Sequence, residues 1–131
     1  MFLLDTDTCI DVLRGRRNVL QKIQGLSPDD CAVSSITAFE LYAGTLLSGY
    51  PERERAKVDR FLEQLTVIDF DRVAAQHAAS IRVELQRDGS TIGAYDLLIA
   101  AQAMRSGLIL VSSNEREFGR IPNLRLESWR G

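Results

Sequence analysis

Short uncharged runs alternate with longer segments of helical periodicity along this chain. The runs at 2–4, 31–34, 66–68 and 108–111 contain no charged residue, which is typical of strands buried on both faces of a parallel sheet. The segments between them carry apolar residues at every third or fourth position, the spacing of one helix face. Strands that alternate with helices predict an α/β fold, a doubly wound parallel sheet with helices on both faces.

Turn and cap residues set the boundaries that we expect for these elements. Glycines follow several periodic segments and predict helix ends, and Pro51 suits the first turn of a helix. The sequence predicts helices at 9–13 before Gly15, at 19–24 between an Asn18 cap and Gly25, from a Ser35 or Thr37 cap to Gly49, from Pro51 to Leu65, from an Asp71 cap to Arg87, at Ile92–Ser106 before Gly107 and at 115–118, with an edge strand within 124–129.

The first strand ends abruptly at Asp5. Thr6, Asp7 and Thr8 follow with side-chain oxygens that suit a helix cap, and Asp11 stands three residues after Thr8, as in a loose capping box. Asp5 is therefore expected at the carboxyl end of a central strand, where open α/β sheets bind ligands. An isolated Asp-x-Asp is also typical of a turn or a cap, so this alternative stays open.

Two further acids fall within apolar helical segments. In the helix after 31–34 we expect an inward stripe made of Ile36, Phe39, Ala43, Leu46 and Leu47, and Glu40 lies within it. A carboxylate on a core-facing side is costly unless it is paired or bound to a metal, although a position at the edge of the stripe would let it reach water. Asp96 lies in the first turn of the 92–106 helix, where the helix dipole alone also favours an Asp.

Composition limits the possible functions. The 131 residues suit a single domain, 1–131, and a net charge of −2 argues against a protein that coats nucleic acid by charge alone. Lys22 and Lys57 are the only lysines among 16 basic residues, and arginine suits phosphate contacts. Two cysteines and one histidine, His77, cannot build a usual zinc site, so we expect buried free thiols. We find no membrane span or signal peptide, and we expect a cytoplasmic protein.

The predicted topology brings these acids to one edge of the sheet. Asp5 and Asn114 follow two strands at their carboxyl ends, and Glu40 and Asp96 lie on helices that flank the same edge. Several carboxylates in one cleft repel one another without a counter-charge. Oxygen ligands with almost no histidine favour Mg²⁺ or Mn²⁺. The chemistry indicated is hydrolysis of a phosphodiester or a phosphomonoester.

Four motifs in order resemble the PIN-domain ribonucleases and, among them, the VapC toxins of VapBC toxin–antitoxin modules. They are L-L-D-T-D, S-S-I-T-A-F-E-L, I-G-A-Y-D-L-L-I-A-A-Q-A and L-V-S-S-N-E-R-E-F, and together they span essentially the whole chain. The resemblance implies a three-layer α/β/α domain with a mostly parallel central sheet and an Mg²⁺- or Mn²⁺-dependent endoribonuclease. It implies that Asp5, Glu40 and Asp96 bind the metal.

The resemblance also implies secondary site residues. Asn114 stands where the family can have an acid, and Glu117, one helical turn on, can supply that carboxylate instead, so we include both as catalytic candidates. Asp7, at a position often occupied by asparagine, together with Thr6 and Ser112, is expected to support the acids. Ala94 replaces a proline that often precedes the third acid by two residues.

The implied partners are a VapB antitoxin, a second copy of the chain in a homodimer, and an RNA substrate such as a tRNA, with initiator tRNA the nearest likeness. Local arginines must then contact RNA phosphates. The candidates are Arg14, Arg16, Arg17, Arg82, Arg87 and Arg116.

Two alternatives use the same residues differently. In a haloacid-dehalogenase-like phosphatase Asp5 would be the nucleophile and Asp7 the acid/base, but the required downstream lysine and late acidic pair are not evident. In a catalytically inactive PIN-like interaction protein the chemistry would be lost, and Asn114 in place of an acid is its only support.

Overall fold

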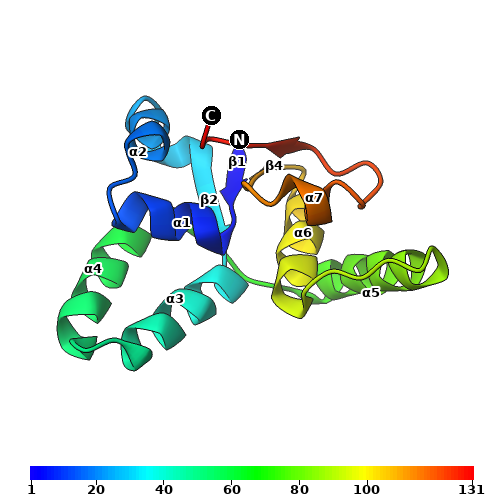
Figure 1. Ribbon diagram of the computed structural model, residues 1–131, viewed down its shortest axis with the longest axis horizontal. Helices are drawn as coiled ribbons and strands as arrows, with labels where there is room; N and C mark the ends of the chain where they lie inside the picture. The colour runs from blue at the N-terminus through cyan, green and yellow to red at the C-terminus, as the bar shows by residue number, and fades with distance from the viewer.

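The computed structural model describes residues 1–131 as a five-stranded sheet in which every neighbouring pair is parallel (Figure 1). The strand order is β3-β2-β1-β4-β5. The strands are β1 Phe2–Leu4, β2 Cys31–Ser34, β3 Thr66–Ile68, β4 Ile109–Val111 and β5 Leu126–Glu127. The predicted doubly wound sheet is confirmed, and it is entirely parallel.

Seven α-helices and one short 3₁₀ helix connect these strands. The α-helices are α1 Thr6–Leu13, α2 Arg17–Gln24, α3 Ser35–Leu47, α4 Pro51–Glu63, α5 Arg72–Arg87, α6 Ala94–Ser106 and α7 Glu115–Phe118, and the 3₁₀ helix is Pro28–Asp30. None of the helices combines the length and the apolar composition that a bilayer crossing requires.

The core has two halves, one on each face of the sheet. Leu3 and Leu110 pack with α5 and α6, whereas Leu4 and Val111 pack with α1, α2 and α4. Because successive strand side chains point to opposite faces, these two clusters are separated by the sheet itself. Figure 1 shows α5 and α6 on one side and α1, α2 and α4 on the other. The arrangement is the expected three-layer α/β/α domain.

Where a cap and a periodic face agree, the predicted helix is confirmed. The Asp71 carboxylate accepts a hydrogen bond from the Ala74 N–H at 2.8 Å and begins α5. The predicted residues Ala74, Ala78, Ile81 and Leu85 form the buried face of that helix. Gly107 ends α6 with φ of 67°, a left-handed conformation that glycine adopts without strain.

The predicted start of α1 is wrong. This helix begins at Thr6 rather than Cys9, because Asp5 is itself the cap and its Oδ1 accepts from the Thr8 N–H at 2.8 Å. Asp11 takes no part in a capping box but forms an ion pair with Arg130. Cys9 and Cys31 are buried free thiols, as expected.

Three other helix starts also differ from prediction. The helix α2 begins at Arg17, and Asn18 donates to the Arg130 carbonyl at 2.9 Å instead of capping. Ser34, rather than Ser35 or Thr37, caps α3, because its hydroxyl accepts from the Ile36 N–H at 3.1 Å. The helix α6 begins at Ala94, two residues after the predicted start.

The predicted inward stripe of α3 is wrong. The buried residues of this helix are Thr37, Leu41 and Thr45, four residues apart, whereas Leu46 and Leu47 are 74% and 89% exposed. The apolar residues of α3 lie on most sides of the helix, so their spacing does not show which face packs against the core. The small threonine side chains let α3 lie close against α1 and α4, and an apolar face is left at the surface.

Candidate active site

The site lies where the strand order reverses. The chain builds β1, β2 and β3 toward one edge, then returns to place β4 on the other side of β1. Loops at the carboxyl ends of β1 and β4 therefore leave in opposite directions, and open α/β sheets bind ligands in the crevice that this creates. Asp5 follows β1 and Ser112 follows β4 at this point.

Asp5 is the most buried acid of the site, with 3% of its surface exposed. Burial raises its pKa above the ordinary value, and the nearby Asp7 charge acts in the same direction. Hydrogen bonds from the Ser112 hydroxyl and from Thr8 oppose this shift. The donors hold the carboxylate in one orientation, but they leave its charge in an unfavourable environment.

Glu40 projects from α3 toward the start of α1. The Thr6 hydroxyl lies 2.6 Å from Glu40 Oε1 and 3.2 Å from the Thr37 hydroxyl. A hydroxyl has one proton, so Thr6 donates to the carboxylate and accepts from Thr37. Glu40 is half-buried and fixed by this contact, rather than directed into the core as the predicted stripe required.

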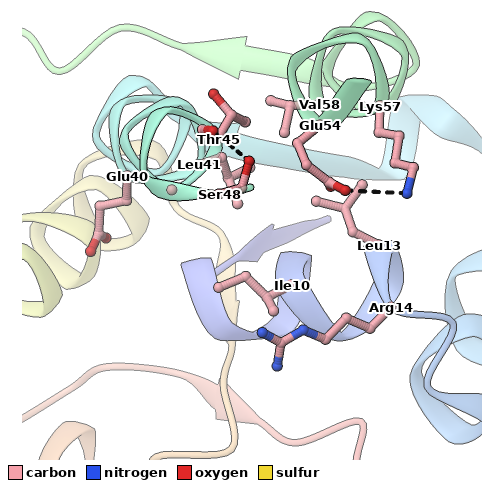
Figure 2. A pocket seen from close by; sticks show the side chains of 11 residues that line it. Ile10, Leu13, Arg14, Glu40, Leu41, Thr45, Ser48, Glu54, Lys57 and Val58 are labelled. Carbon is pink, nitrogen blue, oxygen red and sulfur yellow. Dashed lines mark hydrogen bonds and ion pairs between the residues drawn. The ribbon is translucent and has the colours of Figure 1, made fainter. Parts of the chain in front are cut away.

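A cavity of about 640 Å³ between α1, α3 and α4 extends from Glu40 (Figure 2). Arg14 lines it from the residue after α1, and Lys57, which pairs with Glu54 at 3.5 Å, lines it from α4. Figure 2 shows Glu40 at the opposite end from this ion pair.

Asp96, in the first turn of α6, faces the other acids. Its pKa is raised from 3.8 to about 6. Burial is the largest cause, and the charges of Asp5, Glu117, Asp7 and Glu40 add to it in that order. Four carboxylates, from α1, α3, α7 and the end of β1, therefore lie within electrostatic range of Asp96. We refer to Asp5, Asp7, Glu40, Asp96 and Glu117 as the acidic cluster.

The loop after β4 positions the last member of the acidic cluster. Ser112 is fully buried, and its hydroxyl accepts from the Asn114 N–H at 3.0 Å. The Asn114 side-chain amide in turn donates to Glu117 Oε2 at 2.8 Å. Ser112 therefore holds the backbone of Asn114, and the Asn114 amide orients the Glu117 carboxylate.

The acidic cluster fits a divalent cation in charge and in donor type. None of its five carboxylates forms a salt bridge, since the acids that do so are Asp11, Glu54, Asp59 and Asp71. As the side chains stand, no three of them converge closely enough to ligate one ion. Unpaired carboxylate oxygens at a sheet edge are the ligands that Mg²⁺ and Mn²⁺ prefer.

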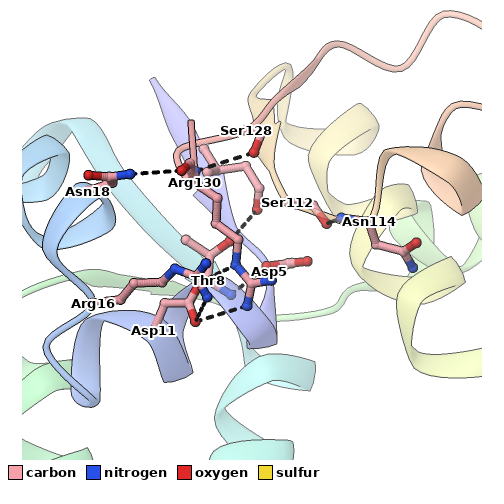
Figure 3. Close-up of polar contacts among 10 residues, drawn as sticks. Asp5, Thr8, Asp11, Arg16, Asn18, Ser112, Asn114, Ser128 and Arg130 are labelled. Carbon is pink, nitrogen blue, oxygen red and sulfur yellow. Dashed lines mark hydrogen bonds and ion pairs between the residues drawn. The ribbon is translucent and has the colours of Figure 1, made fainter.

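Sequence reasoning missed a basic residue beside the acidic cluster. Arg130 binds Asp11 through Nε to Oδ2 at 2.8 Å and through Nη2 to Oδ1 at 3.1 Å (Figure 3). The two residues are 119 positions apart, and no local pattern connects them. Only the parallel placement of the last strand brings them together.

The arginine candidates for RNA contact do not gather at one place. Arg14 lines the cavity near Glu40, Arg16 lies 3.9 Å from Asp11, and Arg82 lines a separate hollow beside the loop before α6. Arg17, Arg87 and Arg116 are exposed on α2, at the end of α5 and on α7.

Comparison with known proteins agrees with this geometry. The PIN domain family model matches residues 2–124. A Salmonella typhimurium protein named tRNA(fMet)-specific endonuclease VapC is 42% identical over 128 residues, which cover 98% of this chain and 97% of that protein. Ribonuclease VapC2 of Haemophilus influenzae is 43% identical over 129 residues, again 98% of this chain and 97% of that protein.

Solved structures show the same fold in VapBC assemblies. A chain of VapBC2 from Rickettsia felis, bound to a DNA fragment from its promoter, superposes with a TM-score of 0.92 at 35% identity and covers 98% of both chains. A chain of DNA-bound VapBC from Salmonella typhimurium gives 0.92 at 41% identity, covering 98% of this chain and 97% of that one. The chain therefore belongs to the PIN domain family and, within it, to the VapC ribonucleases.

Proposed function

We propose that this chain is a divalent-metal-dependent endoribonuclease toxin that hydrolyses phosphodiester bonds in tRNA and is held inactive by a VapB-type antitoxin. The observation that supports it best is the acidic cluster, in which Asp96 has its pKa raised to about 6 by burial and by four other carboxylates. Like charges crowded without a basic partner are arranged to receive a cation. Family membership does not favour the phosphatase alternative or the inactive one.

We assign Asp5, Glu40 and Asp96 to hold Mg²⁺ or Mn²⁺. A bound divalent cation supplies activation of water and neutralises the charge that develops on phosphorus. The Thr6 hydroxyl keeps Glu40 directed at the site, since its contact is 2.6 Å long. Ser112 plays the same part for Asp5.

Glu117 and Asp7 complete the negative surface of the site. The Asn114 amide holds Glu117 at 2.8 Å, so we assign the carboxylate to the site and the amide to its orientation. Asp7 is exposed in the first turn of α1, two residues after Asp5. Both acids add to the field that raises the pKa of Asp96.

The substrate class comes from the relatives. Two of them, from Salmonella typhimurium and Shigella flexneri, are named tRNA(fMet)-specific endonucleases and are 42% and 38% identical to this chain over 128 residues each. We propose initiator tRNA as the first substrate to test. Because tRNA is a cytoplasmic molecule, the proposal implies that the protein acts in the cytoplasm.

The partners are a VapB-type antitoxin, by analogy with the VapBC complexes above, and a second copy of the chain. For the homodimer we assign the apolar face left exposed on α3, since monomers rarely expose contiguous apolar patches without a role. Phe39 and Tyr95 meet there edge to face at 5.4 Å. Leu46 and Leu47, at the end of α3, are exposed as well, and so is Tyr50 in the connection to α4. A purified wild type that sediments as a monomer at micromolar concentration would contradict this assignment.

The decisive test is cleavage of purified initiator tRNA with Mg²⁺ by the wild type and by Asp5→Asn and Asp96→Asn variants. Asparagine keeps an oxygen that can accept the Thr8 N–H, so Asp5→Asn removes the charge without removing the helix cap. We expect both variants to lose cleavage. Glu52→Gln, an exposed acid in the first turn of α4, is the matched control and should keep it. Full cleavage by Asp96→Asn would refute the assignment.

Calorimetry with Mn²⁺ separates the enzyme from the inactive alternative. The wild type should bind the ion at neutral pH, and each of the two asparagine variants should bind it more weakly. A wild type that cleaves no RNA and binds no Mn²⁺ would support the interaction protein instead.

A further inference from the structure

A fixed arginine stands beside the acidic cluster. The Arg130 guanidinium makes two parallel bonds to the Asp11 carboxylate, at 2.8 and 3.1 Å. Asp11 is 7% exposed, whereas 39% of the Arg130 side chain is exposed. These bonds use Nε and Nη2, so the Nη1 group is not engaged by Asp11. A guanidinium that is held on one side, in a side chain that is partly exposed, can bind a second acceptor.

The backbone that carries Arg130 is fixed as well. Trp129 is 4% exposed and meets the Phe2 ring edge to face at 5.5 Å. The Asn18 amide donates to the Arg130 carbonyl at 2.9 Å. In Figure 1 the end of the chain lies against the start of β1. An arginine anchored in this way loses little further freedom when it binds a ligand.

The position of Arg130 relative to the acids follows from α1. Asp7 and Asp11 are four residues apart on this helix and share one face, and Asp5 caps the same helix. Figure 3 shows the Arg130 side chain running down onto Asp11, with Thr8 and Asp5 beside it. The pKa of Arg130 is raised first by the hydrogen bond to Asp11, and the charges of Asp7 and Asp5 add to the shift.

A second arginine joins this group. Arg16 Nη1 lies 3.9 Å from Asp11 Oδ1, and 49% of its side chain is exposed. The two guanidinium groups and the Asp11 carboxylate together carry one net positive charge, at the border of the acidic cluster. The family match covers residues 2–124, so Arg130 lies outside the segment that defines the PIN domain.

We propose that Arg130 and Arg16, gathered on Asp11, bind a backbone phosphate of the RNA next to the phosphate that reaches the acidic cluster. The inference rests on the proposed function and adds a phosphate subsite to it. The acidic cluster repels RNA, so substrate needs fixed cations close to the cut bond, and arginine forks match the geometry of phosphate oxygens. Arg130 is a substrate-positioning residue in this scheme.

The test measures RNA binding without cleavage. Fluorescence anisotropy with a labelled initiator tRNA anticodon stem–loop in EDTA compares the wild type with Arg130→Gln, Arg130→Lys and Arg16→Gln. We expect Arg130→Gln to weaken binding about tenfold and to reduce the slope of log affinity against log salt by about one. The RNA affinity of Arg130→Lys should lie between those of the wild type and Arg130→Gln, because lysine keeps the charge but cannot form two parallel hydrogen bonds.

A matched control is available in the same chain. Arg105 binds Asp71 at 3.2 and 3.3 Å, between α5 and α6 and away from the acidic cluster. Arg105→Gln removes a comparable ion pair and should leave RNA affinity unchanged. Thermal unfolding of every variant separates loss of folding from loss of binding. If Arg130→Gln unfolds, Arg16→Gln and Arg130→Lys carry the test.

A phosphate-specific readout excludes a merely structural role. Stem–loops with a single uncharged methylphosphonate at successive positions should show one position where wild type and Arg130→Gln bind equally. Equal losses for Arg130→Gln and Arg105→Gln, or a difference that persists at every methylphosphonate, would overturn the proposal. Cleavage in Mg²⁺ is measured separately, so loss of the proposed function and loss of this subsite are distinguishable.

Discussion

Replacing Asp96 with asparagine should stabilise the metal-free protein at neutral pH. A rise of its pKa from 3.8 to about 6 corresponds to about 3 kcal/mol of unfavourable free energy for the charged form, at about 1.4 kcal/mol per pKa unit. The carboxylate is only half-buried, so solvent screening reduces this figure. Losing an acid from the first turn of α6 costs about 0.3 to 1 kcal/mol through the helix dipole. The relief of repulsion and of charge burial exceeds the loss of the dipole interaction. The free energy of unfolding of Asp96→Asn should therefore be about 1 to 2 kcal/mol above that of the wild type, or roughly 3 to 8 °C in Tm for a domain of this size.

The sign of the pH dependence follows from the direction of the shift. The folded state holds the Asp96 proton more tightly than the unfolded state, since its pKa is raised above 3.8. The Asp96 contribution to the free energy of unfolding is therefore full below about pH 4 and is lost as the pH rises through about 6. Asparagine does not titrate. The advantage of the variant should be near zero at about pH 4 and complete above about pH 7.

Urea unfolding in EDTA at several pH values measures this difference directly. Glu52→Gln, an exposed acid in the first turn of α4, controls for the helix dipole and should lose a few tenths of a kcal/mol. Added Mn²⁺ should stabilise the wild type more than Asp96→Asn. A variant that is less stable than wild type at neutral pH in EDTA, or one whose gain does not change with pH, would refute the reasoning.

Three further changes test other parts of the structure. Thr6→Val removes the donor 2.6 Å from Glu40 and should slow tRNA cleavage about tenfold in a steady-state assay, whereas Thr6→Ser should retain the rate. Phe118→Ala empties a core position that is 1% exposed and should lower the urea-measured free energy of unfolding by about 3 to 5 kcal/mol. Gly107→Ala forces a side chain onto φ of 67° with no atom within 4 Å of the new Cβ, so calorimetric unfolding should report a loss of about 1 kcal/mol from backbone strain alone.

The sequence predicted those parts of the fold that local signals determine. The helix α5 has a cap, one apolar face and a charged face, and all of these agree. On α3 the apolar residues lie on most sides of the helix, so their spacing wrongly indicated an exposed face as the buried one. The face that packs carries Thr37, Leu41 and Thr45. Which face packs depends on the helices that α3 meets, and they are far away in sequence.

The candidate site likewise has a part that local sequence signals predict and a part that they do not. The positions of Asp5 and Asp96 follow from where a strand ends and where a helix begins, and a parallel sheet brings such positions to one edge. The Asp11–Arg130 pair depends on where the last strand is added to the sheet. No pattern around either residue indicates the other, so the pair is visible only in the folded structure.

The two interpretations of Asp5, as a helix cap and as a site residue, are compatible, because they use different properties of one side chain. The cap needs only an acceptor oxygen, which the Asp5 Oδ1 supplies to Thr8 at 2.8 Å, and serine or asparagine fills that role as well. A cap chosen for stability alone has no reason to carry a charge that is 3% exposed, with its pKa raised by burial. Capping therefore explains the hydrogen bond of Asp5 but does not explain its charge. Proteins keep such locally unfavourable groups where function requires them, and the same reasoning applies to Asp96, whose pKa is also raised by burial.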